Sequence, residues 1–155
     1  MQACFIGHRK IDVTEELVSS LKDVVETLVN EDVTSFLFGS KSAFDDLAWE
    51  VVTDLKNKYP HIKRIYVRAS YQYVDEFYEK FLLESYEETY FPKKVEKAGK
   101  YAYVKRNLEM IDNSTFCIFY YSESYAFSIK RSSGTKTAYE YAIKKGKAVK
   151  NLYKK

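Results

Sequence analysis

Small polar residues and cations follow the short apolar runs of this sequence. Gly7-His8-Arg9 follows the first run, Gly39-Ser40 the second and Arg68 the third, while Ser133-Gly134-Thr135 opens the last helical pattern. Glycine and serine let backbone N–H groups approach a ligand, and guanidinium groups pair with phosphate oxygens. The free N–H groups at a helix N-terminus also attract anions. These four groups therefore predict a binding site for a phosphorylated ligand.

The apolar runs indicate strands, and helical patterns separate them. We expect five strands, at residues 3–6, 34–38, 62–67, 115–121 and 148–153. Strands that alternate with helices pair in parallel, with right-handed crossovers. The expected fold class is α/β: a Rossmann-like three-layer αβα sandwich whose strands, numbered along the chain, have the order 3-2-1-4-5. Residues 1–155 suit a single domain of this kind.

This strand order makes the first and fourth strands neighbours at the point where the sheet changes direction. Sheets of this type open a crevice there, beside the carboxyl ends of the strands. Gly7-His8-Arg9 and Ser133-Gly134-Thr135 would border the crevice, with Gly39-Ser40 beside them and Arg68 one strand further away. The topology thus predicts that residues far apart in the sequence form one ligand site.

Several helices are indicated by apolar stripes of helical period. A stripe over residues 17–28 predicts the first helix, with Asp12 or Thr14 as its N-terminal cap. Further stripes predict helices over residues 44–55, 74–82, 101–111 and 135–145. The stripe in the third of these ranges consists of Tyr101, Val104, Leu108 and Ile111.

Two segments lack a clear period. Residues 85–99 contain Pro92 and Gly99 and are expected to form an irregular flap, and residues 122–133 a polar, aromatic loop. Tyrosines are dense between residues 71 and 103: Tyr71, Tyr73, Tyr78, Tyr86, Tyr90, Tyr101 and Tyr103. Packing of a dimer or of the flap is favoured for them over a platform that stacks a base.

The composition limits the class of protein. The net charge of +3 over 155 residues is too even to indicate a nucleic-acid partner, and no apolar run is long enough to span a membrane. Cys4 and Cys117 form no Cys-x-x-Cys pair, so we expect no metal and no cofactor. On neighbouring strands they could form a redox pair, although apolar filler is favoured. The first residues indicate a strand rather than a signal peptide, which predicts a cytoplasmic protein.

Each candidate residue also has a structural interpretation. Ser133 and Ser42 can simply cap helices. Asp45 can contact a ribose, or it can complement the dipole of the helix that it begins. Arg106 and Asp112 can reach the crevice, or they can form an ion pair or a cap.

Three side chains are candidates for catalysis: Glu140, Asp45 and His8. Glu140 could act as a general base beside the ligand. Alternatively, it is an exposed carboxylate that pairs with Lys136 or Lys144 one helical turn away. The residues leave both roles open.

Five blocks in a fixed order carry a resemblance to known proteins. They are residues 5–10 (FIGHRK), 36–45 (FLFGSKSAFD), 65–69 (IYVRA), 106–112 (RNLEMID) and 133–142 (SGTKTAYEYA). In this order they resemble the SLOG superfamily, and more narrowly its small, single-domain bacterial branch of unknown function. The superfamily is Rossmann-like and binds nucleotides or their derivatives. The resemblance therefore implies a nucleotide-type ligand near Gly7, Arg9, Gly39, Ser40, Gly134 and Thr135.

The superfamily includes Lonely Guy phosphoribohydrolases, which release a base from a nucleoside monophosphate, and proteins thought to act as ligand sensors. The hydrolases carry Gly-Gly-x-Gly-Thr-x-x-Glu, but here Ala138 stands at the glutamate position, and Glu140 lies about 200° further around the helix. The first expectation is therefore binding, and in particular sensing, of a nucleotide or nucleotide derivative. Hydrolysis of an N-glycosidic or phosphate bond is the alternative. The third hypothesis is a protein-interaction module or a nucleic-acid-binding protein, which the basic tail and the tyrosines motivate, although the even charge makes nucleic acid the less favoured partner. A homo-oligomer is left open.

Overall fold

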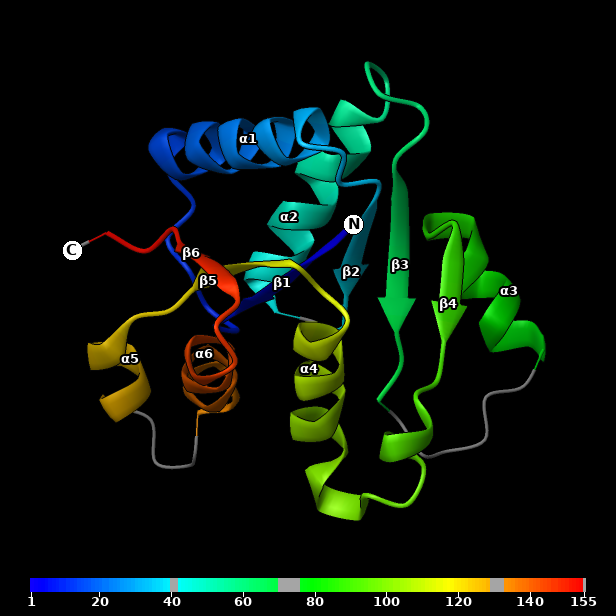
Figure 1. The fold of residues 1–155 in the computed structure, drawn as a ribbon, viewed down its shortest axis with the longest axis vertical. Coiled ribbons are helices and arrows are strands. Elements are labelled where there is room, and N and C mark those ends of the chain that lie inside the picture. Colours follow the sequence, from blue (N-terminus) through cyan, green and yellow to red (C-terminus); the bar gives the residue numbers. More distant parts are fainter. Residues whose placement is uncertain (40–41, 70–75, 129–132, 155) are drawn as a thin grey trace.

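Six short strands form one sheet in the part of the chain that the computed structural model describes, residues 1–39, 42–69, 76–128 and 133–154 (Figure 1). The strands are β1 (Gln2–Gly7), β2 (Ser35–Phe38), β3 (Lys63–Val67), β4 (Glu88–Tyr90), β5 (Phe116–Tyr120) and β6 (Ala148–Asn151). Their order in the sheet is β4-β3-β2-β1-β5-β6, and all neighbours pair in parallel.

The α/β fold class is confirmed, and the five expected strands follow one another in the predicted order. The complete order differs by β4, an added edge strand, so the prediction that residues 85–99 form only an irregular flap is wrong. Polar contacts hold β4 beside β3: Thr89 Oγ1 donates to Tyr66 O at 2.9 Å, and Arg64 pairs with Glu87 at 2.6 Å. A strand of three residues that is held by polar contacts shows no alternation of apolar and polar residues. The sequence pattern therefore could not reveal β4.

Helices cover both faces of the sheet and complete the three-layer sandwich (Figure 1). They are α1 (Glu15–Asn30), α2 (Ala43–Leu55), α3 (Glu76–Ser85), α4 (Ala102–Asp112), α5 (Glu123–Ser128) and α6 (Gly134–Lys144), with the 3-10 helices η1 (Lys93–Val95) and η2 (Gly99–Tyr101). α1 and α2 pack on one face, with Phe5 and Phe38 in the core. α4 and α6 pack on the other, with Leu37 and Phe119. Alternate strand residues thus face opposite layers.

Hydroxyl caps determine where three helices begin. Thr14, Ser42 and Ser133 each accept a hydrogen bond from the backbone N–H three residues further on, at 3.0 to 3.1 Å. These bonds satisfy N–H groups that the first helical turn leaves free. Of the two caps expected for α1, the structure shows Thr14. Gly146 follows α6 with a φ of 69°, a left-handed conformation that favours glycine and ends the helix.

The buried face of α4 differs from the predicted stripe. Ala102, Arg106 and Met110 face the core, whereas Tyr101 is 56% exposed. Arg106 can occupy this face because its guanidinium donates a hydrogen bond to the carbonyl oxygen of Gly39. A search for apolar residues alone therefore misplaces the stripe.

One further prediction about local structure is wrong, and the helix predicted over residues 74–82 is confirmed from residue 76 onward, as α3. Helix α5 occupies part of the segment expected to be a loop, and Ser122 Oγ accepts a hydrogen bond from Tyr125 N at 3.2 Å at its start. In α3, Leu82 is buried, but Phe77 and Phe81 are 82% and 60% exposed. α3 packs beside the edge strand β4, so only a narrow side of this helix is covered.

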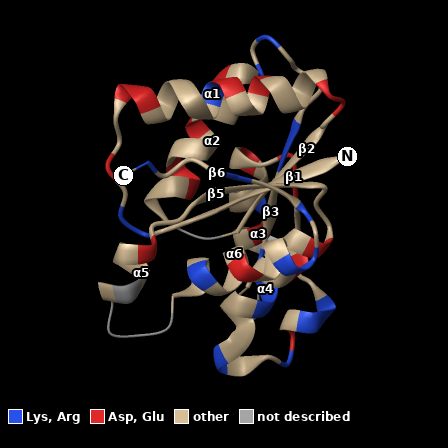
Figure 2. Ribbon diagram, turned by 60° about the vertical axis from the view of Figure 1, so that its left-hand side comes forward, with Lys and Arg blue, Asp and Glu red and all other residues tan. Residues whose placement is uncertain are grey.

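Charged side chains are distributed unevenly over the molecule (Figure 2). α1 contains four acidic residues and one lysine. Residues 93–105, which include η1, η2 and the start of α4, contain five lysines and one glutamate. Figure 2 shows α1 at one end of the view and α4 toward the other, so charges of opposite sign dominate opposite ends of the molecule.

Candidate functional site

The carboxyl ends of β1 and β5 lie side by side, and the chain leaves them toward opposite faces of the sheet. Ile6 is in register with Phe119, and Gly7 with Tyr120. β1 continues to α1 on one face, whereas β5 continues through α5 to α6 on the other (Figure 1). In open α/β sheets, a crevice forms between two such diverging connections.

A crevice of about 320 Å³ occupies this position. Its lining comes from the residues after β1, from the end of β5 and the start of α5, and from the segment after β6: His8, Lys10, Ile11, Asp12, Tyr120, Ser122, Ser124, Tyr125 and Tyr153. This set combines aromatic surface with an imidazole, an ammonium, a carboxylate and two hydroxyl groups. Such a mixture of apolar walls and a few polar groups is typical of small-molecule sites.

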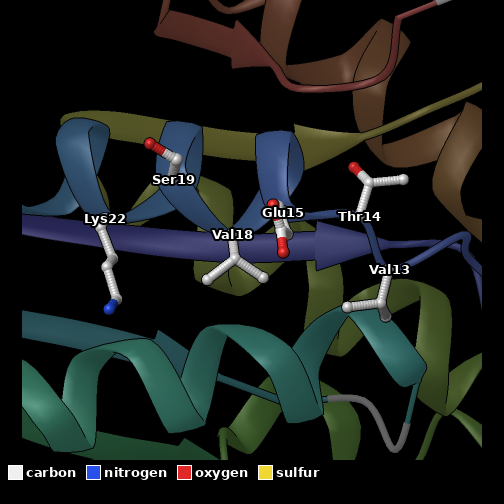
Figure 3. A pocket seen from close by; sticks show the side chains of 6 residues that line it. All are labelled: Val13, Thr14, Glu15, Val18, Ser19 and Lys22. Atoms are coloured by element: carbon white, nitrogen blue, oxygen red, sulfur yellow. The ribbon is translucent and has the colours of Figure 1, made fainter.

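A second hollow, of about 480 Å³, lies along the N-terminal part of α1 (Figure 3). Val13, Val18 and Lys22 point from this segment toward α2, while Ser19 points away from it. Lys22 forms an ion pair with Asp54 of α2 at 3.8 Å. None of the predicted ligand-binding residues lines this hollow, so the crevice between β1 and β5 is the stronger candidate.

The buried side chain of His8 is held by the backbone after β5. Its Nε2 atom lies 2.8 Å from the amide nitrogen of Ser122 and 3.3 Å from the carbonyl oxygen of the same residue. The amide N–H can only donate, so we assign Nε2 as the acceptor and place the proton of the neutral ring on Nδ1. Burial lowers the pKa of His8. The ring packs at 4.5 Å from that of Tyr125, with Tyr120 and Tyr121 also beside it.

Gly7 and Gly39, both predicted to admit a ligand, admit side chains of this chain instead. A Cβ at Gly7 would lie 2.5 Å from the ring of Phe44, and a Cβ at Gly39 would lie 2.5 Å from Cδ of Arg106. Neither glycine lines the crevice. Their lack of a side chain is therefore already required by packing.

The N-terminal end of α6 keeps open space around its backbone. Ser133 caps the helix, and Thr135 is buried. A Cβ at Gly134 would meet no atom within 4 Å. Both expectations for this group, a cap and an accessible helix N-terminus, are thus compatible with the geometry.

Four other predicted residues lie outside the crevice lining or cannot be placed. Arg9 is exposed, and its carbonyl oxygen accepts a hydrogen bond from Ala43 N at 3.0 Å. Arg68 follows β3, two strands away from β1. Glu140 is exposed on α6, and the neighbouring position Ala138 faces the core. Ser40 lies outside the described residues.

A buried polar cluster lies at the carboxyl end of β2. Asp45 reaches it from α2 and Arg106 from α4, and each side chain is 3% exposed. Besides its bond to Gly39, Arg106 donates from Nε to Asn107 Oδ1 at 3.0 Å. Burial lowers the pKa of Arg106, while the carboxylate of Asp45 opposes this change. Burial also raises the pKa of the adjacent Tyr66 to about 12. Arg106 therefore links the two helical layers.

Two further expectations concern packing inside the sandwich. Asp112 accepts a hydrogen bond from the hydroxyl of Tyr141 at 2.7 Å, so it connects α4 to α6. Cys4 and Cys117 are in register on β1 and β5, and both are free and buried. The hydrogen bond with Cys117 and burial raise the pKa of Cys4 well above its ordinary value. The same hydrogen bond lowers the pKa of Cys117, and the burial of both side chains is compatible with the role of apolar filler.

Of the residues that line the crevice, sequence reasoning named only His8 as ligand-binding, and it missed the others: Lys10, Ile11, Asp12, Tyr120, Ser122, Ser124, Tyr125 and Tyr153. The switch-point argument selects residues that directly follow a strand, and applying it to every strand end would include Ser122 and Tyr153. Tyr125 could not be found in this way, because its position depends on the short helix α5.

Two structural features are absent from the described ranges. No group of three or more His, Cys, Asp or Glu side chains there is arranged to hold a metal ion. Across the same ranges, no helix combines the length and apolar character that a membrane crossing needs.

The fold and the crevice together define a class: a Rossmann-like αβα domain with a polar, aromatic crevice at its switch point. A family model described as the YspA SLOG family matches residues 7–154, so the chain belongs to this family. The resemblance to the SLOG superfamily is thereby confirmed. A search of curated proteins found no match to the chain.

Proposed function

We propose that the crevice between β1 and β5 binds a nucleotide or a nucleotide-derived ligand, and that the protein senses this ligand. The observation that carries the proposal is the lining of the switch point, where an ammonium group, hydroxyl groups and three tyrosines surround a buried imidazole. Open α/β sheets bind their ligands at this position. Nucleotide binding in the superfamily supports the same choice.

The lining has a suitable partner for each part of a nucleotide. Tyr120, Tyr125 and Tyr153 have aromatic rings against which a base can pack. Lys10 contributes positive charge for a phosphate group, and serine hydroxyls can hydrogen-bond to a ribose. The open N-terminal end of α6 at Gly134 is a second place where a phosphate could lie.

The candidate bases favour binding over turnover. Glu140 is exposed and does not line the crevice. Nε2 of His8 already accepts a hydrogen bond from Ser122, so its lone pair is not available to take a proton from a substrate. Asp45, the third candidate, is buried and does not line the crevice. None of the three meets the geometric need of a general base. Sensing therefore takes precedence over hydrolysis in the proposal.

Thermal unfolding in the presence of a panel of nucleoside mono-, di- and triphosphates, cyclic nucleotides and dinucleotides tests the proposal. A ligand at a hundredfold excess over Kd stabilises the native state by about 2.7 kcal/mol, so a selective rise in Tm is expected. Lys10→Ala should reduce that rise, because it removes the ammonium group of the crevice. Lys144→Ala, which changes an exposed lysine on α6, should preserve it. A wild-type protein that no nucleotide stabilises would refute the proposal.

A second pair of variants asks whether the phosphate lies at α6. The side chains introduced by Gly134→Asp and Gly134→Asn are nearly equal in size, and a Cβ at this position meets no atom within 4 Å. Only the aspartate repels a phosphate, so a smaller Tm rise for Gly134→Asp alone places the phosphate there. Chromatography of the same incubations separates sensing from hydrolysis: unchanged nucleotides support sensing, and their consumption supports an enzyme.

A further inference from the structure

A cationic and aromatic surface extends over η1, η2 and the start of α4. We call it the 93–105 surface, and its exposed cationic and aromatic side chains are Lys93, Lys94, Lys97, Lys100, Lys105, Tyr101 and Tyr103, with Glu96 exposed among them. None of them lines the crevice between β1 and β5. Figure 2 shows several basic positions gathered in the lower part of the view, around α4.

The 93–105 surface carries more positive charge than the rest of the chain. Five lysines against one glutamate give residues 93–105 a net charge of +4, whereas the whole chain carries +3, so the remaining residues are slightly acidic. Lys94 forms an ion pair with Glu109 at 3.6 Å. Among the described residues, the other four lysines of the segment form no ion pair. Their charge is available to an anionic partner.

Two tyrosines lie between these lysines with their rings accessible. Tyr101 is 56% exposed and Tyr103 is 64% exposed. Cationic groups lie beside both rings: Lys100 Nζ is 5.2 Å from the centre of the Tyr101 ring, and the Arg106 guanidinium is 5.7 Å from that of Tyr103. The surface therefore combines positive charge with rings that can stack on a flat partner.

We infer that the 93–105 surface binds single-stranded nucleic acid. Lysines neutralise backbone phosphates, and exposed aromatic rings stack on unpaired bases without regard to sequence. A duplex hides its base faces, so the two tyrosines would have nothing to stack on. The even net charge of the chain argued against a nucleic-acid partner, but it averages over a cationic surface and an acidic remainder. This binding uses no residue of the proposed nucleotide site, so either proposal can fail alone.

Fluorescence anisotropy with a labelled oligothymidylate of about 20 nucleotides tests the inference on the full chain, because aromatic single-strand sites cover roughly 4–16 nucleotides. The affinity should fall steeply as salt rises. Each neutralised phosphate contributes about −0.7 to the slope of log K against log salt for single strands, so Lys93→Ala/Lys97→Ala/Lys100→Ala should reduce the slope by about 2. Tyr101→Ala/Tyr103→Ala should weaken binding about tenfold or more, while the double phenylalanine variant should retain it.

The control is the triple variant Lys144→Ala/Lys145→Ala/Lys150→Ala. Its lysines lie at the C-terminal end of α6 and on β6, outside the 93–105 surface. It removes the same number of exposed lysines, including one whose ammonium group lies beside a tyrosine ring, at 5.4 Å. Its affinity and salt slope should stay closer to those of the wild-type protein. Three outcomes would overturn the inference: no binding at about 50 mM salt, at which single-strand binding is strong, equal loss in both triple variants, or preference for a duplex or for vesicles of anionic lipid.

Discussion

The imidazole of His8 is buried, and we assign its Nε2 atom as the acceptor of a hydrogen bond from the amide of Ser122. Protonation would require this nitrogen to give up that bond. Burial therefore keeps the pKa of folded His8 below its ordinary value of 6.5, at which the unfolded chain titrates. Near pH 6 the unfolded chain binds more protons than the folded protein. The stability that His8 contributes is thus fully present above pH 6.5 and is lost as the pH falls through the folded pKa.

We expect Tm to fall when the pH is lowered from about 7.5 to about 5.5, and His8→Gln to show a weaker fall. Glutamine cannot be protonated, yet its amide oxygen can still accept the hydrogen bond of Ser122. Glu87 does not titrate between pH 7.5 and 5.5. Burial alone would raise its pKa, but the hydrogen bonds and the charge of Arg64 lower the pKa from its ordinary value of 4.5. The stability that Glu87 contributes is therefore lost only at lower pH. Equal pH profiles for the two proteins would contradict the prediction.

Gly39 and Gly134 have opposite surroundings, and their substitution by alanine should show it. Gly39→Ala places a methyl group against Arg106 and Met110, so we expect the free energy of unfolding to fall by about 1–3 kcal/mol. Gly134→Ala meets open space in the first turn of α6 and should leave stability unchanged or raise it by up to about 1 kcal/mol. Urea unfolding measures both variants. A Gly39→Ala protein as stable as the wild type would show that Arg106 does not need this space.

At the scale of elements, β4 shows how a strand forms without a hydrophobic pattern. Lys63, Arg64 and Tyr66 of β3 all contact residues 87–89 through polar groups. Glu87 is the most connected of these, because it accepts from both the backbone N–H and the guanidinium of Arg64, at 2.8 and 2.6 Å. Polar side-chain contacts thus add to the backbone ladder between β3 and β4 and to the packing of Tyr90 against the core.

Glu87→Ala should therefore loosen β4. We expect a loss of about 1–2 kcal/mol in the free energy of unfolding, together with faster amide hydrogen exchange in residues 88–90, because charged hydrogen bonds at a half-buried site are lost. Glu88→Ala is the matched control. Its carboxylate forms an ion pair with Lys63 at 3.1 Å, but both side chains are 53% exposed, so the change should be within about 0.5 kcal/mol. Similar effects of the two substitutions would contradict this account of β4.

At the scale of the molecule, the two proposed binding surfaces belong to different connections of one sheet. The crevice is formed by the connections that leave β1 and β5, whereas the 93–105 surface belongs to the connection between β4 and β5. The thermal-shift and anisotropy experiments therefore test different residues. A nucleotide-induced rise in Tm that survives the loss of Lys93, Lys97 and Lys100 would show that the two surfaces act independently.

The sequence by itself determined the elements whose evidence is local. Apolar runs bounded by turn residues predicted five strands, and the caps Thr14, Ser42 and Ser133 follow from side-chain chemistry within three residues. The alternation of strands and helices then predicted the parallel sheet and its switch point, because right-handed crossovers leave few other topologies. The location of the crevice was predicted from this topology, whereas the family was predicted from five sequence blocks in a fixed order.

Only the tertiary structure decided what each candidate residue contacts. Arg106 meets Gly39 across 67 residues of sequence, and His8 meets Ser122 across 114. Both contacts depend on which side chains fill the same space once the layers pack, and no local period carries that information. The same packing places Phe44 against Gly7, and it leaves Glu140 exposed on α6 and outside the crevice lining. Local chemistry can therefore select the edge of the sheet where a ligand site lies, whereas its lining residues are selected by contacts between distant parts of the chain.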